Sequence, residues 1–250
     1  MAEECRATLF INSYIATTER ISPTYQGPPE LNYCSGPLSY SDSVTITGKG
    51  TYQSREPYYV SSSVGGLGAP GSPHPIRHAE VRVTNTNGDL IQCTETDETG
   101  SFRLQLPRGD GTFTLGIQAR SFNSYVKASL LNAPEQNILY SLNTTVKANA
   151  NQDIGTLNAL ATRDDGLLGG AFNILDQIHL ANDFIRSKAS NCSSVFSVCP
   201  NFTVTSKVSV YWQPGFNPGS YFGSTSLSFY LPGYSRLFIL GGLNGDVDNS

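Results

Sequence analysis

Three histidines are the residues of this chain best suited to hold a metal ion, and two of them lie close together. His74 and His78 form an H-x-x-x-H pair, a spacing that on a helix would place both side chains on one face. Pro73 and Pro75 exclude a helix here, because proline lacks a backbone donor and clashes with the preceding turn. No third ligand is evident near the pair. We therefore expect a solvated loop at His74 and His78, and no zinc bound to this chain.

The third histidine, His179, falls in a segment with helical periodicity. Apolar residues recur along Ala171–Lys188 at the spacing of one helix face, and His179 lies beside that face. We interpret it as a packed or surface histidine. The sequence contains no nucleophile elbow, phosphate-binding loop, H-E-x-x-H or C-x-x-C pattern, so no residue of this chain is assigned a catalytic role.

An acidic segment at the end of the sequence has the character of a cation-binding loop. Asn244, Asp246 and Asp248 place oxygen-bearing side chains at alternate positions next to a glycine, as calcium loops do. The bidentate glutamate of an EF-hand is missing. Two interpretations stay open: a site for calcium or another cation, and an acidic turn that follows a strand.

Five cysteines indicate a protein that forms disulfides. Cys192 and Cys199 can close a short loop. Cys5 and Cys34 flank a segment rich in proline and tyrosine that has little core of its own, where a cross-link would stabilise most. We expect these two pairs, with Cys93 left over in the middle of a strand.

The composition is typical of an extracellular, β-rich protein with long loops. Charged residues make up only 14% of the 250 residues, and glycine (24), proline (14) and tyrosine (13) are abundant. A net charge of −4 argues against nucleic-acid binding, which needs a surface of lysine and arginine. No apolar stretch approaches the roughly 20 residues of a membrane-spanning helix. We expect a secreted or cell-envelope protein.

The run from Ala79 to Ala119 has the clearest pattern of secondary structure. Apolar and polar residues alternate in four short segments, which predicts four β-strands. Asn87-Gly88 provides a tight hairpin turn, since both residues accept positive φ. The run predicts a four-strand meander with one apolar face, which must be covered by a second sheet.

The remaining segments complete a mainly β fold. We expect residues 1–42 to form an extended arm pinned by cysteines, and residues 43–160 to form an antiparallel β-sandwich. The Gly- and Pro-rich stretch Ser61–Pro75 is predicted to be a surface loop. Residues 161–250 form a partial α+β region, with the helix Ala171–Lys188 and about three strands. That region carries too few elements to bury its own apolar residues.

The sandwich resembles the carboxypeptidase regulatory-like, or transthyretin-like, domain. The likeness rests on Ile76–Val83, on the T-D-x-x-G-x-F turn at Thr96–Phe102 and on the G-x-F-x-L strand at Gly111–Leu115. In the turn, Asp97 can accept backbone hydrogen bonds and Gly100 supplies positive φ. The resemblance covers about residues 43–160 and implies an accessory β-sandwich of the transthyretin-like or immunoglobulin-like kind.

The region from about Gly170 onward resembles the opening of the catalytic domain in large secreted bacterial proteins of the zinc-metallopeptidase type. The similar stretches are GAFNILDQIHLANDFIRS, KVSVYWQPGFNPGSYFG and SFYLPGYSRLFILGGLNGDVDNS. In those proteins such a region leads to a helix with an H-E-x-G-H zinc motif. That motif is absent here, so no zinc ligand or general base is carried over, and zinc is expected only in a longer parent protein.

Two functions follow from this reading. In the first, the chain is the non-catalytic N-terminal part of a secreted or cell-envelope metallopeptidase-like protein, and its partner is its own downstream catalytic domain. In the second, it is a complete extracellular binding or adhesion module. Its clustered aromatic residues would then recognise a glycan, a peptide or a protein, although aromatic side chains more often fill cores.

Overall fold

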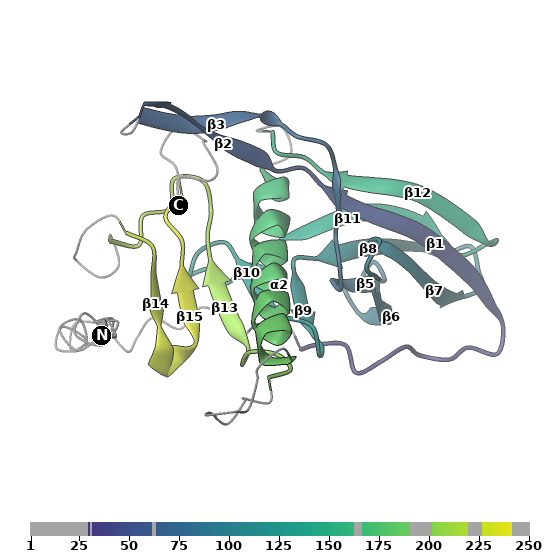
Figure 1. Ribbon diagram of the computed structural model, residues 1–250. Helices are drawn as coiled ribbons and strands as arrows, with labels where there is room; N and C mark the ends of the chain where they lie inside the picture. The colour runs from purple at the N-terminus through teal and green to yellow at the C-terminus, as the bar shows by residue number, and fades with distance from the viewer. Residues whose placement is uncertain are drawn as a thin grey trace.

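The fold is mainly β, as the sequence predicts, with several antiparallel ladders and one long helix in the described part of the chain (Figure 1). The computed structural model describes residues 30, 32–61, 64–162, 167–190, 202–219 and 227–241. The expected calcium loop at Asn244, Asp246 and Asp248 and the expected Cys192–Cys199 pair lie outside these residues. Among the described residues, no helix combines the length and apolar character that a membrane crossing requires.

Two four-stranded sheets face each other as a β-sandwich. In the first, β1 is the central strand, and it pairs with β12, β4 and β7. In the second, the order is β11-β8-β5-β6. The first sheet comprises β1 (Ser43–Tyr52), β4 (His74–Pro75), β7 (Ser101–Pro107) and β12 (Gln152–Ala159). The second comprises β5 (Glu80–Thr84), β6 (Leu90–Glu95), β8 (Thr112–Gln118) and β11 (Ser141–Lys147).

The four strands of Ala79–Ala119 form where the alternation predicts them, but they do not form a meander. Strand β7 leaves β6 and pairs with β1 in the opposite sheet, while β8 returns to pair with β5. The apolar residues Phe102, Leu104 and Leu106 of β7 therefore enter the core from the opposite side to those of β5 and β8. The prediction was wrong about pairing because alternation identifies a buried face and does not specify the sheet that carries it.

Gly100 permits this crossover. Its φ is +78°, and a Cβ atom on it would lie 2.3 Å from the carbonyl oxygen of Gly50 in β1. The amide of Gly50 donates to the carbonyl of Gly100 at 2.8 Å. Asp97 holds the same turn through its Oδ1 atom, which accepts hydrogen bonds from the amides of Thr99 and Ser101. The turn chemistry expected from the sequence is confirmed.

Part of the stretch predicted to be a surface loop forms strands. A hairpin joins β2 (Arg55–Ser61) to β3 (Val64–Pro70), and β4 follows it. The Arg55 guanidinium donates to the carbonyls of Gly68 and Leu67 at 2.6 and 3.0 Å. The loop prediction for Ser61–Pro75 was wrong because glycine weakens a strand without excluding one when the partner strand is adjacent in sequence.

A five-stranded sheet joins the sandwich to the C-terminal region. Its order is β14-β15-β13-β10-β9, with β10 and β13 in parallel, so its strands come from both sides of residue 161. The strands are β9 (Arg120–Phe122), β10 (Lys127–Leu131), β13 (Val208–Tyr211), β14 (Phe229–Leu231) and β15 (Arg236–Phe238), and a short 3-10 turn η3 (Pro232–Tyr234) separates the last two.

Helix α2 (Leu168–Ser190) contains the whole predicted helix and packs on β1, β10 and β12 (Figure 1). Phe172 and Leu175 are buried in the same core as the sandwich residues. The helix begins in close contact with the residue that follows β1, because a Cβ atom on Gly169 would lie 2.3 Å from the carbonyl oxygen of Gln53. The apolar stripe is only half buried, since Phe184 is 62% and Ile185 41% exposed.

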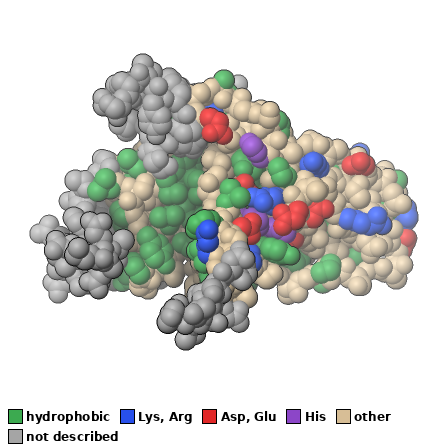
Figure 2. Space-filling model, viewed as in Figure 1, with side chains coloured by type: hydrophobic (Ala, Val, Ile, Leu, Met, Phe, Trp, Pro, Cys, Tyr) green, Lys and Arg blue, Asp and Glu red, His purple; other side chains and the backbone are tan. Residues whose placement is uncertain are grey.

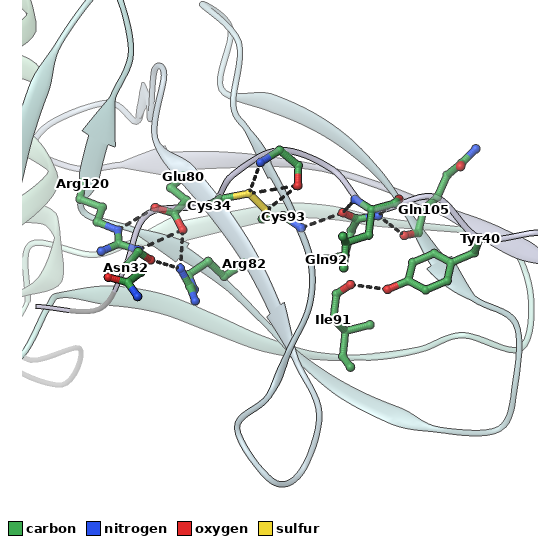
Figure 3. Close-up of a disulfide and its surroundings, with 12 residues drawn as sticks. Asn32, Cys34, Tyr40, Glu80, Arg82, Ile91, Gln92, Cys93, Gln105 and Arg120 are labelled. Carbon is green, nitrogen blue, oxygen red and sulfur yellow. Dashed lines mark hydrogen bonds and ion pairs between the residues drawn. A yellow bond between two sulfur atoms is a disulfide. The ribbon is translucent and has the colours of Figure 1, made fainter.

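A disulfide fixes the extended arm to the sandwich, but its partners differ from those expected. Cys34 bonds to Cys93 of β6, with 6.1 Å between their Cα atoms (Figure 3). The expected Cys5–Cys34 pair is therefore wrong, and Cys93 is not the unpaired cysteine. The arm runs beside β6, where Gln92 exchanges two hydrogen bonds of 2.8 Å with the backbone of Leu38. Sequence spacing did not predict the disulfide, because Cys34 of the arm lies beside a strand whose cysteine is 59 residues away in the sequence.

A buried ion pair lies next to this disulfide. Arg120 is fully buried and donates to the Glu80 carboxylate at 2.7 and 3.1 Å (Figure 3). The same guanidinium donates to the backbone carbonyl of Asn32 at 2.9 Å and lies over the ring of Tyr33. Such a pair contributes little net stability but is costly to break, because a buried charge would lose its partner. The arm thus supplies a further hydrogen-bond acceptor, the Asn32 carbonyl, to the buried Arg120 guanidinium.

The Cys34–Cys93 bond is expected to stabilise the protein by about 4 kcal/mol, the loop-closure entropy that a loop of this length loses in the unfolded state. Urea unfolding of the oxidised protein should show this loss when both cysteines are replaced by serine. Peptide mapping without reductant should recover the cross-linked Cys34 and Cys93 peptides. Recovery of Cys34 linked to Cys5 would contradict the assignment.

Candidate functional site

Two histidines that lie 101 positions apart in the printed sequence meet beside helix α2. The rings of His78 and His179 stack with their centroids 5.1 Å apart. His78 lies in the turn between β4 and β5, and His179 lies on the helix. On the face shown in Figure 2, histidine side chains gather with acidic and basic side chains near the middle of the molecule.

His78 is held in an unusual backbone conformation. Its φ is +54°, in the left-handed region that residues other than glycine seldom adopt, and its side chain is largely buried. The ring also stacks on Tyr125, with centroids 4.1 Å apart and planes within 5°. Backbone strain of this kind persists where the surrounding structure fixes it, and it is common at functional sites.

Glu98 adds a carboxylate to the two imidazoles. It lies in the turn between β6 and β7, and the Nε2 atom of His78 donates to its Oε1 atom at 2.8 Å. One ligand atom each from His78, Glu98 and His179 can be chosen so that all three lie within 4.8 Å of one another. The cluster therefore brings together the helix and two turns, each of which connects a strand of one sheet to a strand of the other.

His179 is the buried member of the cluster. It is 1% exposed, and neither of its ring nitrogens has a hydrogen-bond partner among the described residues. The Asp183 carboxylate lies 3.3 Å from its Nδ1 atom, within ion-pair distance but without hydrogen-bond geometry. Buried polar atoms are nearly always hydrogen-bonded in native proteins, so this imidazole is an exception that needs a physical reason.

Charged and hydroxyl groups surround the cluster. Arg77 donates through Nε and Nη2 to one carboxylate oxygen of Asp176 at 2.9 and 2.7 Å, and its Nη1 atom lies 3.8 Å from Glu98. The hydroxyl of Tyr52 donates to the other oxygen of Asp176 at 2.8 Å. Burial raises the pKa of that hydroxyl, and the Asp176 charge raises it further. Tyr52 therefore stays a donor and Asp176 a fixed counter-charge for Arg77.

Burial and charge shift the pKa values of two cluster members downward. Desolvation is the largest cause for His179, whose pKa is lowered, and the positive charge of Arg77 adds to it. The pKa of Glu98 is lowered mainly by the hydrogen bond from His78. At neutral pH, His179 is therefore an uncharged imidazole with a free nitrogen lone pair, and Glu98 is a carboxylate. These are the protonation states in which both groups bind metal ions.

The sequence prediction was right about part of the histidine environment. His179 is packed, as one of the two expected alternatives had it, and His78 lies in a turn between strands. His78 is buried rather than solvated, however, so that part of the prediction was wrong. His74 lies on β4 with its ring 5.5 Å from that of Tyr52, and it is not part of the cluster. Glu98 was recognised only as part of a turn, and His179 only as a residue beside an apolar stripe. No local spacing could have joined them, because the contact depends on how α2 packs on the sandwich.

Comparisons with known proteins leave the family of this chain open. No family model and no curated protein matches the sequence. Among solved structures, it is similar to a DUF3823 family protein from Parabacteroides merdae, with 15% identity and a TM-score of 0.25 over 48% of this chain and 46% of that one. A 9R-lipoxygenase from Cyanothece aligns with 11% identity and a TM-score of 0.26 over 73% of this chain and 33% of that one. The chain spans less than half of either, and scores this low carry no functional argument.

The buried, neutral His179 predicts a pH dependence of stability. A histidine whose pKa is lower in the folded protein binds a proton more readily when unfolded, so its stabilising contribution is present above about pH 6.5 and is lost as the pH falls. Urea unfolding in the presence of a chelator should show the unfolding free energy falling from pH 7.5 to pH 5.5.

The same measurement on two variants isolates the group responsible. His179→Gln should flatten the dependence, whereas His74→Ala should retain it, because His74 is exposed. A slope unchanged in His179→Gln would contradict the assignment. Glu98, whose pKa is lowered, adds a separate loss only at more acidic pH, below its usual value near 4.5.

Proposed function

We propose that this chain is the non-catalytic N-terminal part of a secreted or cell-envelope protein of the metallopeptidase type. In this proposal the β-sandwich is an accessory unit that supports the helix and sheet on which a downstream catalytic domain is built. The observation that carries it is the fusion of the sandwich with the C-terminal region through one sheet and one core. No residue of this chain is given a catalytic role.

The fusion rests on contacts that cross residue 161. Strand β10, which follows the sandwich strands, forms a parallel ladder with β13 from Ala128 to Leu131. Trp212 is fully buried in the same apolar cluster as Leu115 and Ile117 of the sandwich. The Tyr140 hydroxyl donates to the Trp212 carbonyl at 2.9 Å. An accessory domain joined by a flexible linker would lack such contacts, so the sandwich supports a scaffolding role better than that of a mobile appendage.

An exposed apolar surface on α2 supports the presence of a further packing partner. Leu180, Phe184 and Ile185 are exposed in the second half of the helix. Leu180 and Phe184 are four residues apart and therefore lie on one face, and apolar side chains gathered on a surface often mark an interaction site. We assign it to the downstream catalytic domain of the same polypeptide, in agreement with the resemblance of this region to the opening of such a domain.

The alternative, a complete binding or adhesion module, has less support. Three of the aromatic residues that could stack on a sugar, Tyr211, Trp212 and Phe216, are buried in cores. A pocket of about 380 Å³ lies beside the disulfide, lined by Tyr33, Glu95 and Phe122 among others. Its most buried carboxylate, Glu80, is already paired with Arg120. These three aromatic residues therefore act in packing, whereas Tyr230 and Tyr234 are exposed. The pocket alone does not favour a ligand class.

The reading frame of the gene provides the first test. A coding sequence that continues past codon 250 into an H-E-x-x-H segment would support the proposal. A stop codon immediately after codon 250 would contradict it and favour the complete binding module.

The second test compares the same substitutions in the 250-residue chain and in the longer protein. Phe184→Gln combined with Ile185→Gln should change the unfolding free energy of the short chain by no more than about 0.5 kcal/mol, because both side chains are exposed there. In the longer protein the pair should cost about 2 kcal/mol or more, since buried apolar surface would be lost. Ile138→Gln, exposed and remote from α2, serves as the control and should be neutral in both. Equal effects of the helix pair in the two proteins would contradict the assigned packing.

A further inference from the structure

Packing of the fold does not by itself explain the position of the polar atoms of His78, Glu98 and His179. Packing can explain a buried aromatic ring, but the His179 imidazole loses its hydration and makes no hydrogen bond within the described part of the chain, although Asp183 lies 3.3 Å from its Nδ1 atom. The positive φ of His78 is a second, independent departure from ordinary structure at the same place. Both departures occur at the same place, where a carboxylate from a third segment also lies within 4.8 Å of the imidazole nitrogens.

We propose that His78, Glu98 and His179 bind one zinc ion, which links helix α2 to the turns before β5 and β7. This inference is independent of the proposed function, because it concerns residues of this chain and not the zinc motif of a downstream domain. It also reverses the expectation that this chain holds no zinc. That expectation considered His74 and His78 alone, without the two ligands that folding brings to His78.

The donor set selects zinc rather than calcium or magnesium. Two imidazole nitrogens and one carboxylate are typical zinc ligands, whereas calcium and magnesium require mainly oxygen donors. Zinc with three protein ligands keeps a fourth position for water. The neutral state of His179, which its burial favours, leaves a nitrogen lone pair available without loss of a proton.

To bind the ion, the three donor atoms must move closer together and the two stacked imidazoles must turn, because a metal lies in the plane of each ring that binds it. Zinc–nitrogen bonds of about 2.0–2.1 Å require neighbouring donors on a tetrahedral ion to be about 3.3 Å apart, compared with at most 4.8 Å here. The Glu98 side chain is 59% exposed and can move without disturbing the core. Its hydrogen bond with His78 would be exchanged for two bonds to the ion, and His78 would bind through Nε2 with its proton on Nδ1 instead.

The surrounding charges are compatible with a cation. Arg77 is the nearest positive group, and Asp176 neutralises it through two hydrogen bonds. Asp183 lies 3.3 Å from Nδ1 of His179, so zinc bound at Nε2 would leave the Nδ1 proton facing a carboxylate. This arrangement of carboxylate, histidine and zinc recurs in metalloproteins, where the carboxylate orients the ring.

The test is zinc titration of the untagged 250-residue protein, with its disulfides intact and its metals removed by a chelator. Calorimetry should give one zinc per chain, and zinc should raise the melting temperature while calcium and magnesium at the same concentration should not. Glu98→Gln, a substitution at an exposed side chain, should weaken zinc binding at least about tenfold, since even residues that only orient ligands have effects of that size. His74→Ala is the matched control and should bind zinc as the wild type does.

Two results would overturn the proposal. The first is the absence of stoichiometric zinc binding, which would leave the three rings of His78, Tyr125 and His179 as a packed aromatic stack. The second is zinc binding that Glu98→Gln and His78→Asn both leave unchanged, which would place the ion elsewhere. Cobalt substitution gives a readout that does not depend on variant stability: a tetrahedral visible spectrum without sulfur charge-transfer bands supports this site, and such bands would assign the metal to cysteines.

Discussion

The burial of one face of helix α2 against the sandwich is the interaction on which the arrangement of the molecule depends. Phe172 and Leu175 complete the core between the sheets, and the helix begins against β1, where Gly169 leaves no room for a larger side chain. At roughly 25 cal/mol per Å² of apolar surface, burying such side chains outweighs any single polar contact in the region. The direction of the helix is thereby fixed, and with it the position of every residue on its other faces.

Two features of the functional site follow from that direction. His179 is carried onto the turn that holds His78, next to the ring of Tyr125 and the carboxylates of Glu98 and Asp183. The helix also brings Asp176 to Arg77 and Tyr52, so that a charge network forms beside the histidines. The same packing leaves Phe184 and Ile185 of the helix exposed. One packing interaction therefore generates both a polar cluster and an interaction surface.

The sequence predicted local secondary structure better than it predicted which distant segments of the chain contact one another. Alternation in Phe102–Leu106 and helical spacing in Ala171–Lys188 found the strand and the helix, because both patterns depend on neighbours a few residues apart. The transfer of β7 to the opposite sheet and the Cys34–Cys93 bond depend on how distant segments meet, and no local pattern records that. The sequence did not predict the histidine cluster for the same reason. The prolines around His74 exclude a helix at His74 and His78, but they give no information about a contact with His179.

We expect helix α2 and the sandwich to form one cooperative structure that holds the histidine cluster together. Native-state hydrogen exchange of the metal-free protein tests this most directly, because it measures the opening free energy of each element separately. Amides in the buried half of the helix, from Phe172 to Ile178, should exchange through the same global opening as those of β7 and β8. Exchange of the helix amides at much lower free energy, while the sandwich amides stay protected, would contradict it.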